Sequence, residues 1–131
     1  MFKKNFLKKI VGAFGERKAA KYLIKKGYRI VERNVNTPFG EVDIIASVGT
    51  VLVFVEVKTR SSEQYGAGIE AVTINKQKKL IKSAQYYCKM KNITPLCRFD
   101  VIAIDINHFG IRAIKNITHL ENAFICYSSY K

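Results

Sequence analysis

The pattern of apolar and polar residues is most regular between Gly40 and Arg60, which reads GEVDIIASVGTVLVFVEVKTR. Alternation with a period of two predicts two β-strands, and Gly49 followed by Thr50 suits a two-residue type II′ turn between them. Such a turn places residues whose numbers sum to 99 opposite each other. One predicted face is charged and holds Glu41, Asp43, Glu56 and Lys58, and the other is apolar and holds Val42, Ile44, Ala46, Val48, Val51, Val53, Val55 and Val57.

The charged face contains two carboxylates in opposed positions. In this register Asp43 faces Glu56, and Glu41 faces Lys58. Two carboxylates with Cβ atoms about 5 Å apart repel each other unless a cation or a shared proton lies between them. The pattern therefore predicts a cation site at Asp43 and Glu56. A simple ion pair with Glu41 is the structural alternative for Lys58.

Residues 5–26 have the period of an amphipathic helix. Its apolar stripe includes Ala13, Ala20, Leu23 and Ile24, and Glu16 lies in the middle of that stripe. Glu16 is therefore a candidate third carboxylate of the site, and the alternative is an acid favoured by the dipole of the first helical turn. Gly12 and Gly15 weaken the helix, so we expect its start near Gly15 and a loose basic arm over residues 1–12.

The remaining segments complete a predicted order of α-β-β-β-α-β-β. Residues 61–73 form a predicted mobile loop with a possible role in substrate contact, and Thr73 caps a second helix. The buried side of that helix is predicted to hold Ile74, Gln77, Leu80, Ile81, Ala84, Tyr87 and Cys88. The other predicted strands are 28–35, 98–106 and 111–114, and ITHLENAF is expected to be a short helix or coil.

This order predicts a single α/β domain over residues 1–131. Because the second helix crosses from the third strand to the fourth, the sheet is expected to be mixed, with helices packed on it. A chain of 131 residues with 48% hydrophobic content is long enough for one substantial core.

The charge of the chain changes this picture, because the formal net charge is +13. Residues 1–33 contain eleven Lys and Arg against two acids, and residues 73–98 contain seven and no acid. Two basic segments thus flank an acidic centre. This arrangement favours a nucleic acid as partner, and the alternative is a solvated basic surface or a docking surface for an acidic protein.

Two function classes are disfavoured by the sequence. The N-terminal segment is basic but has no long apolar run, so neither a signal peptide nor a membrane span is expected. The cysteines, Cys88, Cys97 and Cys126, lack metal-ligand spacing and are expected to be reduced and mostly buried, as in a cytoplasmic protein.

The acidic centre has the residue types that phosphodiester hydrolysis requires. Carboxylates around Mg²⁺ or Mn²⁺ supply a hard-cation site, and a lysine two residues beyond a ligand lies on the same strand face, where it can orient water or offset charge on the phosphate. Asp43, Glu56 and Lys58 match this requirement, with Glu16 as the third carboxylate.

These motifs resemble the core of the PD-(D/E)xK nucleases, in particular the archaeal Holliday-junction resolvases and the bacterial YraN family of uncharacterised proteins. The YraN-like motifs span nearly the whole chain: Gly15-Glu16 with Ala19 and Tyr22-Leu23, Asn34, Gly40-Glu41-Val42-Asp43, Phe54-Val55-Glu56-Val57-Lys58, Arg60, Arg98-Phe99-Asp100-Val101 and Asn122-Ala123-Phe124. The resemblance implies a restriction-endonuclease-like fold with Asp43, Glu56 and Glu16 as metal ligands and Lys58 as the catalytic lysine. Val42 stands where many of these nucleases have proline.

The expected function is therefore metal-dependent cleavage of DNA, including branched or structured DNA, and a homodimer is implied by the resemblance alone. The alternative is a nucleic-acid-binding module of the same fold without catalysis. Phosphate contacts are expected from the basic residues Arg17, Lys18, Arg60, Lys76 and Lys79. For Arg17 and Arg60 the alternative is a surface position without a phosphate contact. Arg98 and Asp100 are expected to bridge neighbouring elements, and His119 to have no role in the site.

Overall fold

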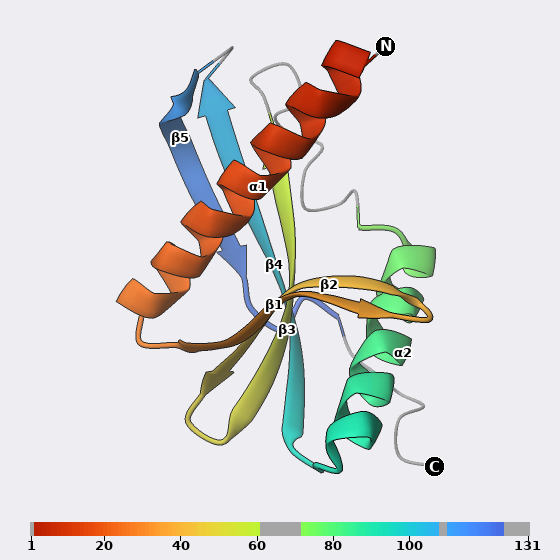
Figure 1. Ribbon diagram of the computed structural model, residues 1–131. Coiled ribbons are helices and arrows are strands. Elements are labelled where there is room, and N and C mark those ends of the chain that lie inside the picture. The colour runs from red at the N-terminus through yellow and green to blue at the C-terminus, as the bar shows by residue number, and fades with distance from the viewer. Residues whose placement is uncertain (1, 61–71, 108–109, 125–131) are drawn as a thin grey trace.

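The helices and strands occur in the predicted order. The computed structural model describes residues 2–60, 72–107 and 110–124. The elements are α1 (Phe2–Lys25), β1 (Arg29–Thr37), β2 (Gly40–Val48), β3 (Val51–Arg60), α2 (Ile74–Lys91), β4 (Leu96–Asn107) and β5 (Gly110–Leu120), as Figure 1 shows. The α/β class and the order α-β-β-β-α-β-β are confirmed.

The five strands form one mixed sheet in the order β1-β2-β3-β4-β5. Only the β3–β4 pair is parallel among the four ladders, because α2 carries the chain from the end of β3 back to the start of β4. The two helices cover opposite faces of the sheet (Figure 1). Phe14, Ala19 and Leu23 of α1 belong to one core, and Leu80 and Tyr87 of α2 belong to the other.

The register of the β2–β3 hairpin is the one that the turn geometry predicts. Ile44 pairs with Val55, and the ladder continues to Val48 opposite Val51. Gly49, the first central residue of the turn, has a positive φ of 57°, and Thr50, the second, does not have a positive φ. This combination fits a type II′ turn. The expectation of a single apolar face is wrong, because α2 buries the second face as well, with Ile45, Leu52 and Phe54 in its core.

The alternation of side chains breaks at Asp43. The β1–β2 ladder pairs Arg33 with Ile44 and Val35 with Val42, and between them Asn34 takes a left-handed φ of 53°. Ile44 packs in the α1 core, whereas Val42 packs in the α2 core. The predicted grouping of Val42 with Ile44 on one face is therefore wrong, and this change of face lies on either side of Asp43.

Helix α1 starts at Phe2 and continues through both glycines, so the expected start near Gly15 is wrong. Gly15 has a packing role: a Cβ atom added there would lie 1.7 Å from Oγ1 of Thr59. The absence of a side chain thus lets α1 approach the end of β3 closely. Nothing lies within 4 Å of a Cβ atom added at Gly12, which has no such constraint.

Helix α2 is capped as predicted, because the backbone N–H of Lys76 donates to Oγ1 of Thr73 over 3.1 Å. The buried face of α2 differs from the predicted one at two positions. Ile74 is 64% exposed, whereas Ser83 is buried because its Oγ lies 2.8 Å from Oγ1 of Thr37 at the end of β1. The helix ends at Asn92, which caps it in the left-handed conformation.

The C-terminal part contains more strand than the sequence predicts. Strand β5 extends to Leu120, which pairs with Val101, so the expected helix or coil over ITHL is wrong. The ladder from β4 overrides the mixed polar pattern of this segment. Most of the predicted 61–73 loop lies outside the described residues, as do residues 108–109 of the predicted turn.

Two further observations concern the other function classes. Among the described residues, no helix is long and apolar enough to cross a membrane. Cys97 is exposed and Cys88 half-buried, which corrects the expectation of buried cysteines, because Cys97 lies at the start of β4. Cys126 lies outside the described residues.

Candidate functional site

The candidate site lies where β2 and β3 separate. Their ladder ends at Ile44 opposite Val55, so the predicted ladder pairs Asp43–Glu56 and Glu41–Lys58 do not form. Instead, the backbone N–H of Val57 donates to Oδ2 of Asp43 over 2.8 Å. A side-chain carboxylate thus takes the place of a backbone carbonyl, and the two strands form a fork with Asp43 at its base.

Three carboxylates meet at this fork. One carboxylate oxygen each from Glu16, Glu41 and Asp43 lies within 4.8 Å of the others. Glu16 reaches the fork from α1, because the neighbouring Gly15 packs against β3. The structure thus brings Glu16 to Asp43, as the sequence predicts, and adds Glu41, which the sequence assigns only to an ion pair. The sequence contained one signal for this role of Glu41: it lies two residues before Asp43 and so falls on the same strand face.

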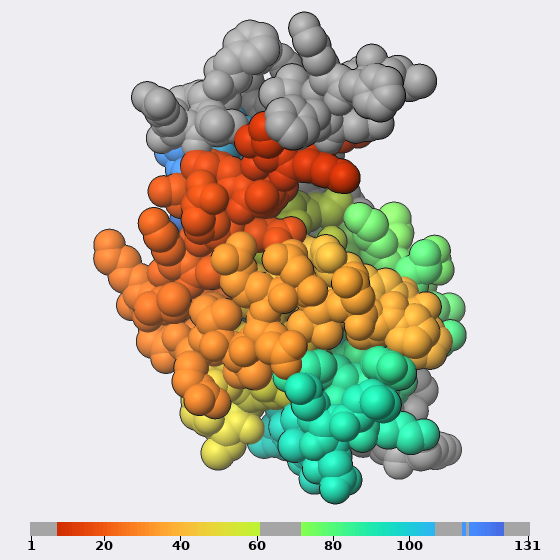
Figure 2. Space-filling model, viewed as in Figure 1, coloured from red at the N-terminus to blue at the C-terminus, as the bar shows by residue number. Residues whose placement is uncertain are grey.

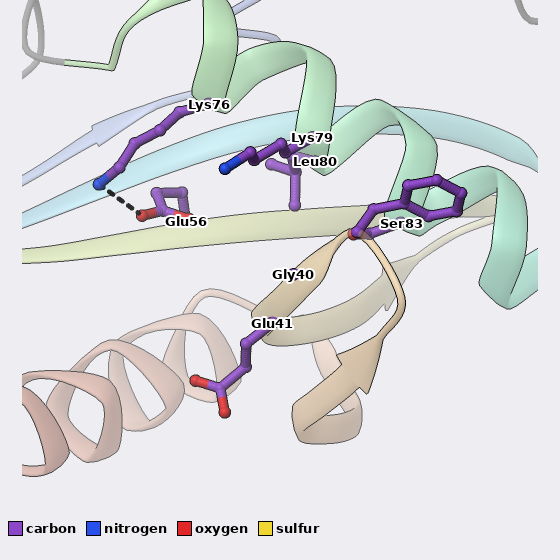
Figure 3. A pocket seen from close by; sticks show the side chains of 8 residues that line it. Gly40, Glu41, Glu56, Lys76, Lys79, Leu80 and Ser83 are labelled. Atoms are coloured by element: carbon purple, nitrogen blue, oxygen red, sulfur yellow. Dashed lines mark ion pairs between the residues drawn. The ribbon is translucent and has the colours of Figure 1, made fainter.

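Glu56 lies on the α2 side of the fork. Its carboxylate is 4.0 Å from Nζ of Lys76, and Figure 3 shows Glu41 pointing away from this pair, toward α1. Both acids line one pocket, together with Phe39, Gly40, Lys76, Lys79, Leu80 and Ser83. Glu56 is therefore close enough to influence Asp43 electrostatically, but it is not part of the cluster of three.

The surroundings of Asp43, Glu16 and Glu56 disfavour the ionised form of each carboxyl group. Burial raises the pKa of Asp43 to about 8, with further increases from Glu56, Glu16 and Glu41, and the N–H of Val57 opposes the shift. Burial also raises the pKa of Glu16 and of Glu56, the latter against the opposing charges of Lys76 and Lys58. Three oxygen donors with such an excess of charge fit a hard divalent cation.

Lys58 is the cation on β3 nearest in sequence to Glu56. Burial and the positive charge of Lys76 lower the pKa of Lys58, while Glu56 opposes that decrease. Within the described part of the chain, Lys58 and Glu41 form no ion pair. The alternative prediction, that Lys58 only pairs with Glu41 across the hairpin, is therefore wrong.

The predicted phosphate-binding residues fall into two groups. Arg17, Lys76 and Lys79 are exposed, and Lys18 is half-buried with its Nζ 5.5 Å from the centre of the Phe14 ring. Nε and one terminal nitrogen of Arg60 each lie 2.8 Å from Oδ1 of the buried Asp105 of β4. Figure 2 shows the β1–β2 hairpin at the surface between α1 and α2, so that both basic helices border the same region.

A second polar cluster lies away from the fork. Arg98 binds both carboxylate oxygens of Asp100, over 2.9 and 2.8 Å, and His119 Nε2 lies 2.7 Å from Asp100 Oδ2. Nζ of Lys26 lies 3.0 Å from Nδ1 of His119. The predicted bridging role of Arg98 and Asp100 is confirmed. The buried position of His119 was missed, because it follows from the unpredicted length of β5.

Comparison with known proteins gives a consistent family. The model of the uncharacterised protein family UPF0102 matches residues 15–104. A UPF0102 protein of Pelotomaculum thermopropionicum is 46% identical over 118 residues, which are 89% of this chain and 97% of that protein. A UPF0102 protein of Caldanaerobacter subterraneus is 44% identical over 89% of this chain and 96% of its own length. A UPF0102 protein of Shewanella sediminis is 44% identical over 86% of this chain and 90% of its own length. This chain therefore belongs to the uncharacterised protein family UPF0102, the YraN family.

Proposed function

We propose that this protein is a divalent-metal-dependent endonuclease that hydrolyses phosphodiester bonds in DNA. The observation that carries the proposal is the convergence of Glu16, Glu41 and Asp43 within 4.8 Å, beside Glu56 and Lys58. Three elements contribute these groups, and like charges at such proximity repel one another, most strongly at the half-buried Glu16 and Asp43, unless a cation compensates them.

The carboxylates of Asp43, Glu16 and Glu41 would hold Mg²⁺ or Mn²⁺, with Glu56 as a further candidate ligand. The cation would supply Lewis-acid polarisation of the phosphate and neutralise charge in the transition state. Asp43 is kept in place by the N–H of Val57, so its orientation is set before a ligand binds. Lys58, with its lowered pKa, exchanges protons with water more readily than an ordinary lysine.

The positive charge supports DNA as the substrate class. Exposed lysines of α2 lie beside the pocket, and a net charge of +13 attracts a polyanion. The phosphate backbone would therefore be drawn to the same side of the molecule as the carboxylates.

The proposal is tested by cleavage of end-labelled duplex, flap, junction and single-stranded DNA with Mg²⁺ or Mn²⁺. We expect cleavage by the wild type, and a loss of about 100-fold or more in Asp43→Asn and Lys58→Met. The matched control is Lys89→Met, which removes an exposed lysine from the last turn of α2 and is expected to retain activity. Metal-independent binding of all substrates without cleavage of any would favour a binding module instead.

A further inference from the structure

An exposed aromatic ring lies at the tip of the β1–β2 hairpin. Phe39 is 41% exposed in the turn between the two strands, where Gly, Asn, Asp and Ser are the usual residues. Part of the ring is therefore open to solvent at this turn and accessible to a ligand.

The ring is held in a defined position by contacts on both sides of the turn. The backbone N–H of Phe39 donates to Oγ1 of Thr37 over 3.1 Å, and the same Oγ1 lies 2.8 Å from Oγ of Ser83 in α2. The ring meets Tyr86 edge-on, with centroids 6.4 Å apart. The hairpin tip is thus fixed to α2, and Phe39 is presented with little freedom to move.

Phe39 also borders the acidic fork. It lines the same pocket as Glu41 and Glu56, and Lys76 and Lys79 line that pocket too. In addition, Nζ of Lys82 lies 5.8 Å from the centre of the Phe39 ring. An aromatic surface, several ammonium groups and a carboxylate cluster therefore occur within one short stretch of surface.

We propose that Phe39, with Lys79 and Lys82, forms a stacking site for one unpaired nucleobase next to the phosphodiester at the fork. This inference rests on the proposed nuclease function and names the substrate class: DNA with an unpaired nucleotide at the point of cleavage. Every base has a π face that stacks on an aromatic ring, and lysines bind the adjoining phosphates. A base inside a duplex has both faces covered by its neighbours, so only an unpaired base gains this contact.

The test compares two DNA molecules that differ only in pairing. Fluorescence anisotropy measures the affinity of the protein for a labelled duplex and for the same duplex with a short single-stranded gap, without divalent metal. In Phe39→Ala we expect affinity for the gapped DNA to fall about tenfold, with affinity for the duplex unchanged. Phe39→Tyr is expected to bind like the wild type. Ile74→Ala, which removes another exposed apolar side chain at the start of α2, is the matched control and is expected to change neither affinity.

A second measurement tests whether Phe39 contacts the unpaired base itself. With 2-aminopurine at the unpaired position, binding of the wild type is expected to change its fluorescence by stacking, and Phe39→Ala is expected to lack that change. An equal loss of affinity for both DNA molecules, or no loss for either, would overturn the inference. If Phe39→Ala behaves like the wild type while metal-dependent cleavage persists, the stacking site fails and the nuclease proposal stands. Absence of DNA binding by the wild type would overturn both.

Discussion

Asp43 is a half-buried acid whose carboxylate accepts a backbone hydrogen bond and lies beside two other carboxylates. Its ordinary pKa of 3.8 becomes about 8 through burial and the charge of Glu56. At a pH between these two pKa values, Asp43 is protonated in the folded protein and ionised in the unfolded chain. The stability of the metal-free protein therefore decreases as pH rises from about 4 to 8. The ionisation of one residue thus opposes folding, and a cation bound at this carboxylate would remove that effect.

Asp43→Asn is expected to raise the stability of the metal-free protein near pH 8, by on the order of 3 kcal/mol, because no charge remains to be buried. The same variant should lose the increase in melting temperature that Mn²⁺ gives the wild type. Thermal unfolding in EDTA and in Mn²⁺ between pH 5 and 8 measures both effects. Equal melting temperatures of variant and wild type at every pH would contradict this account.

Asp100 shows the opposite behaviour. Burial would raise its pKa, but hydrogen bonds from His119, Arg98 and the N–H of Asn122 outweigh burial and hold it below 3.8. Its stabilising contribution is therefore complete above the unfolded pKa and is lost as pH falls through the lower folded pKa.

Asp100→Asn is expected to destabilise the protein by about 3 kcal/mol at pH 7, because Arg98 loses its buried counter-charge. Urea unfolding followed by circular dichroism measures the loss. Glu121→Gln is the control: this exposed acid also contacts Arg98, over 3.6 Å, and its removal should cost under about 1 kcal/mol. Similar losses in the two variants would show that burial of Asp100 adds nothing.

At the scale of elements, the position of α1 on β3 decides where Glu16 lies. Gly15 allows the close approach, since an added Cβ atom would meet Thr59 Oγ1 at 1.7 Å. Repacking such a contact typically costs about 1–3 kcal/mol and would move the helix away from the sheet.

Gly15→Ala is therefore expected to destabilise the protein and to weaken Mn²⁺ binding, measured by urea unfolding and titration calorimetry. Gly12→Ala in the same helix is expected to be neutral or to stabilise by up to about 1 kcal/mol, because space is free there. Thr59→Ala should partly restore the Gly15→Ala variant. If both glycine substitutions stabilise, the close packing at Gly15 has no role in placing Glu16.

The elements also show which parts of the fold follow from sequence. Local signals were sufficient for the turn at Gly49, the register of the β2–β3 hairpin and the cap at Thr73. The left-handed φ of Asn34 and the full length of β5, which pairs with β4, are not revealed by periodicity within one segment. For the site, alternation along the strands placed Asp43 and Glu56 on neighbouring strands, but the opening of the ladder beyond Ile44 and the approach of Glu41 to Asp43 depend on tertiary contacts.

At the scale of the whole molecule, charge is divided between two helices on opposite faces of the sheet. Both helices border the fork, through Glu16 of α1 and Lys76 of α2. The sequence predicted basic segments around an acidic centre, and the fold places that centre between the two helices. A polyanion that follows one or both helices would pass the carboxylates.

DNA affinity is therefore expected to fall steeply with salt, in a linear relation between the logarithms of the binding constant and the salt concentration. Lys79→Gln should lower affinity and reduce the slope by about one. Lys91→Gln serves as control, because Lys91 lies 3.5 Å from Glu32 at the far end of α2. Anisotropy titrations at several salt concentrations measure both slopes. Identical slopes for all three proteins would place the phosphate contacts elsewhere.

The hydrogen bond from Val57 to Asp43 has a spectroscopic consequence. An amide proton is strongly deshielded by a charged acceptor, so the Val57 cross-peak in a ¹⁵N–¹H spectrum should shift as Asp43 loses its proton. It should shift again when a cation withdraws charge from that carboxylate. One backbone resonance therefore reports the ionisation and the occupancy of the fork, in the intact protein and without a substrate or a label near the site.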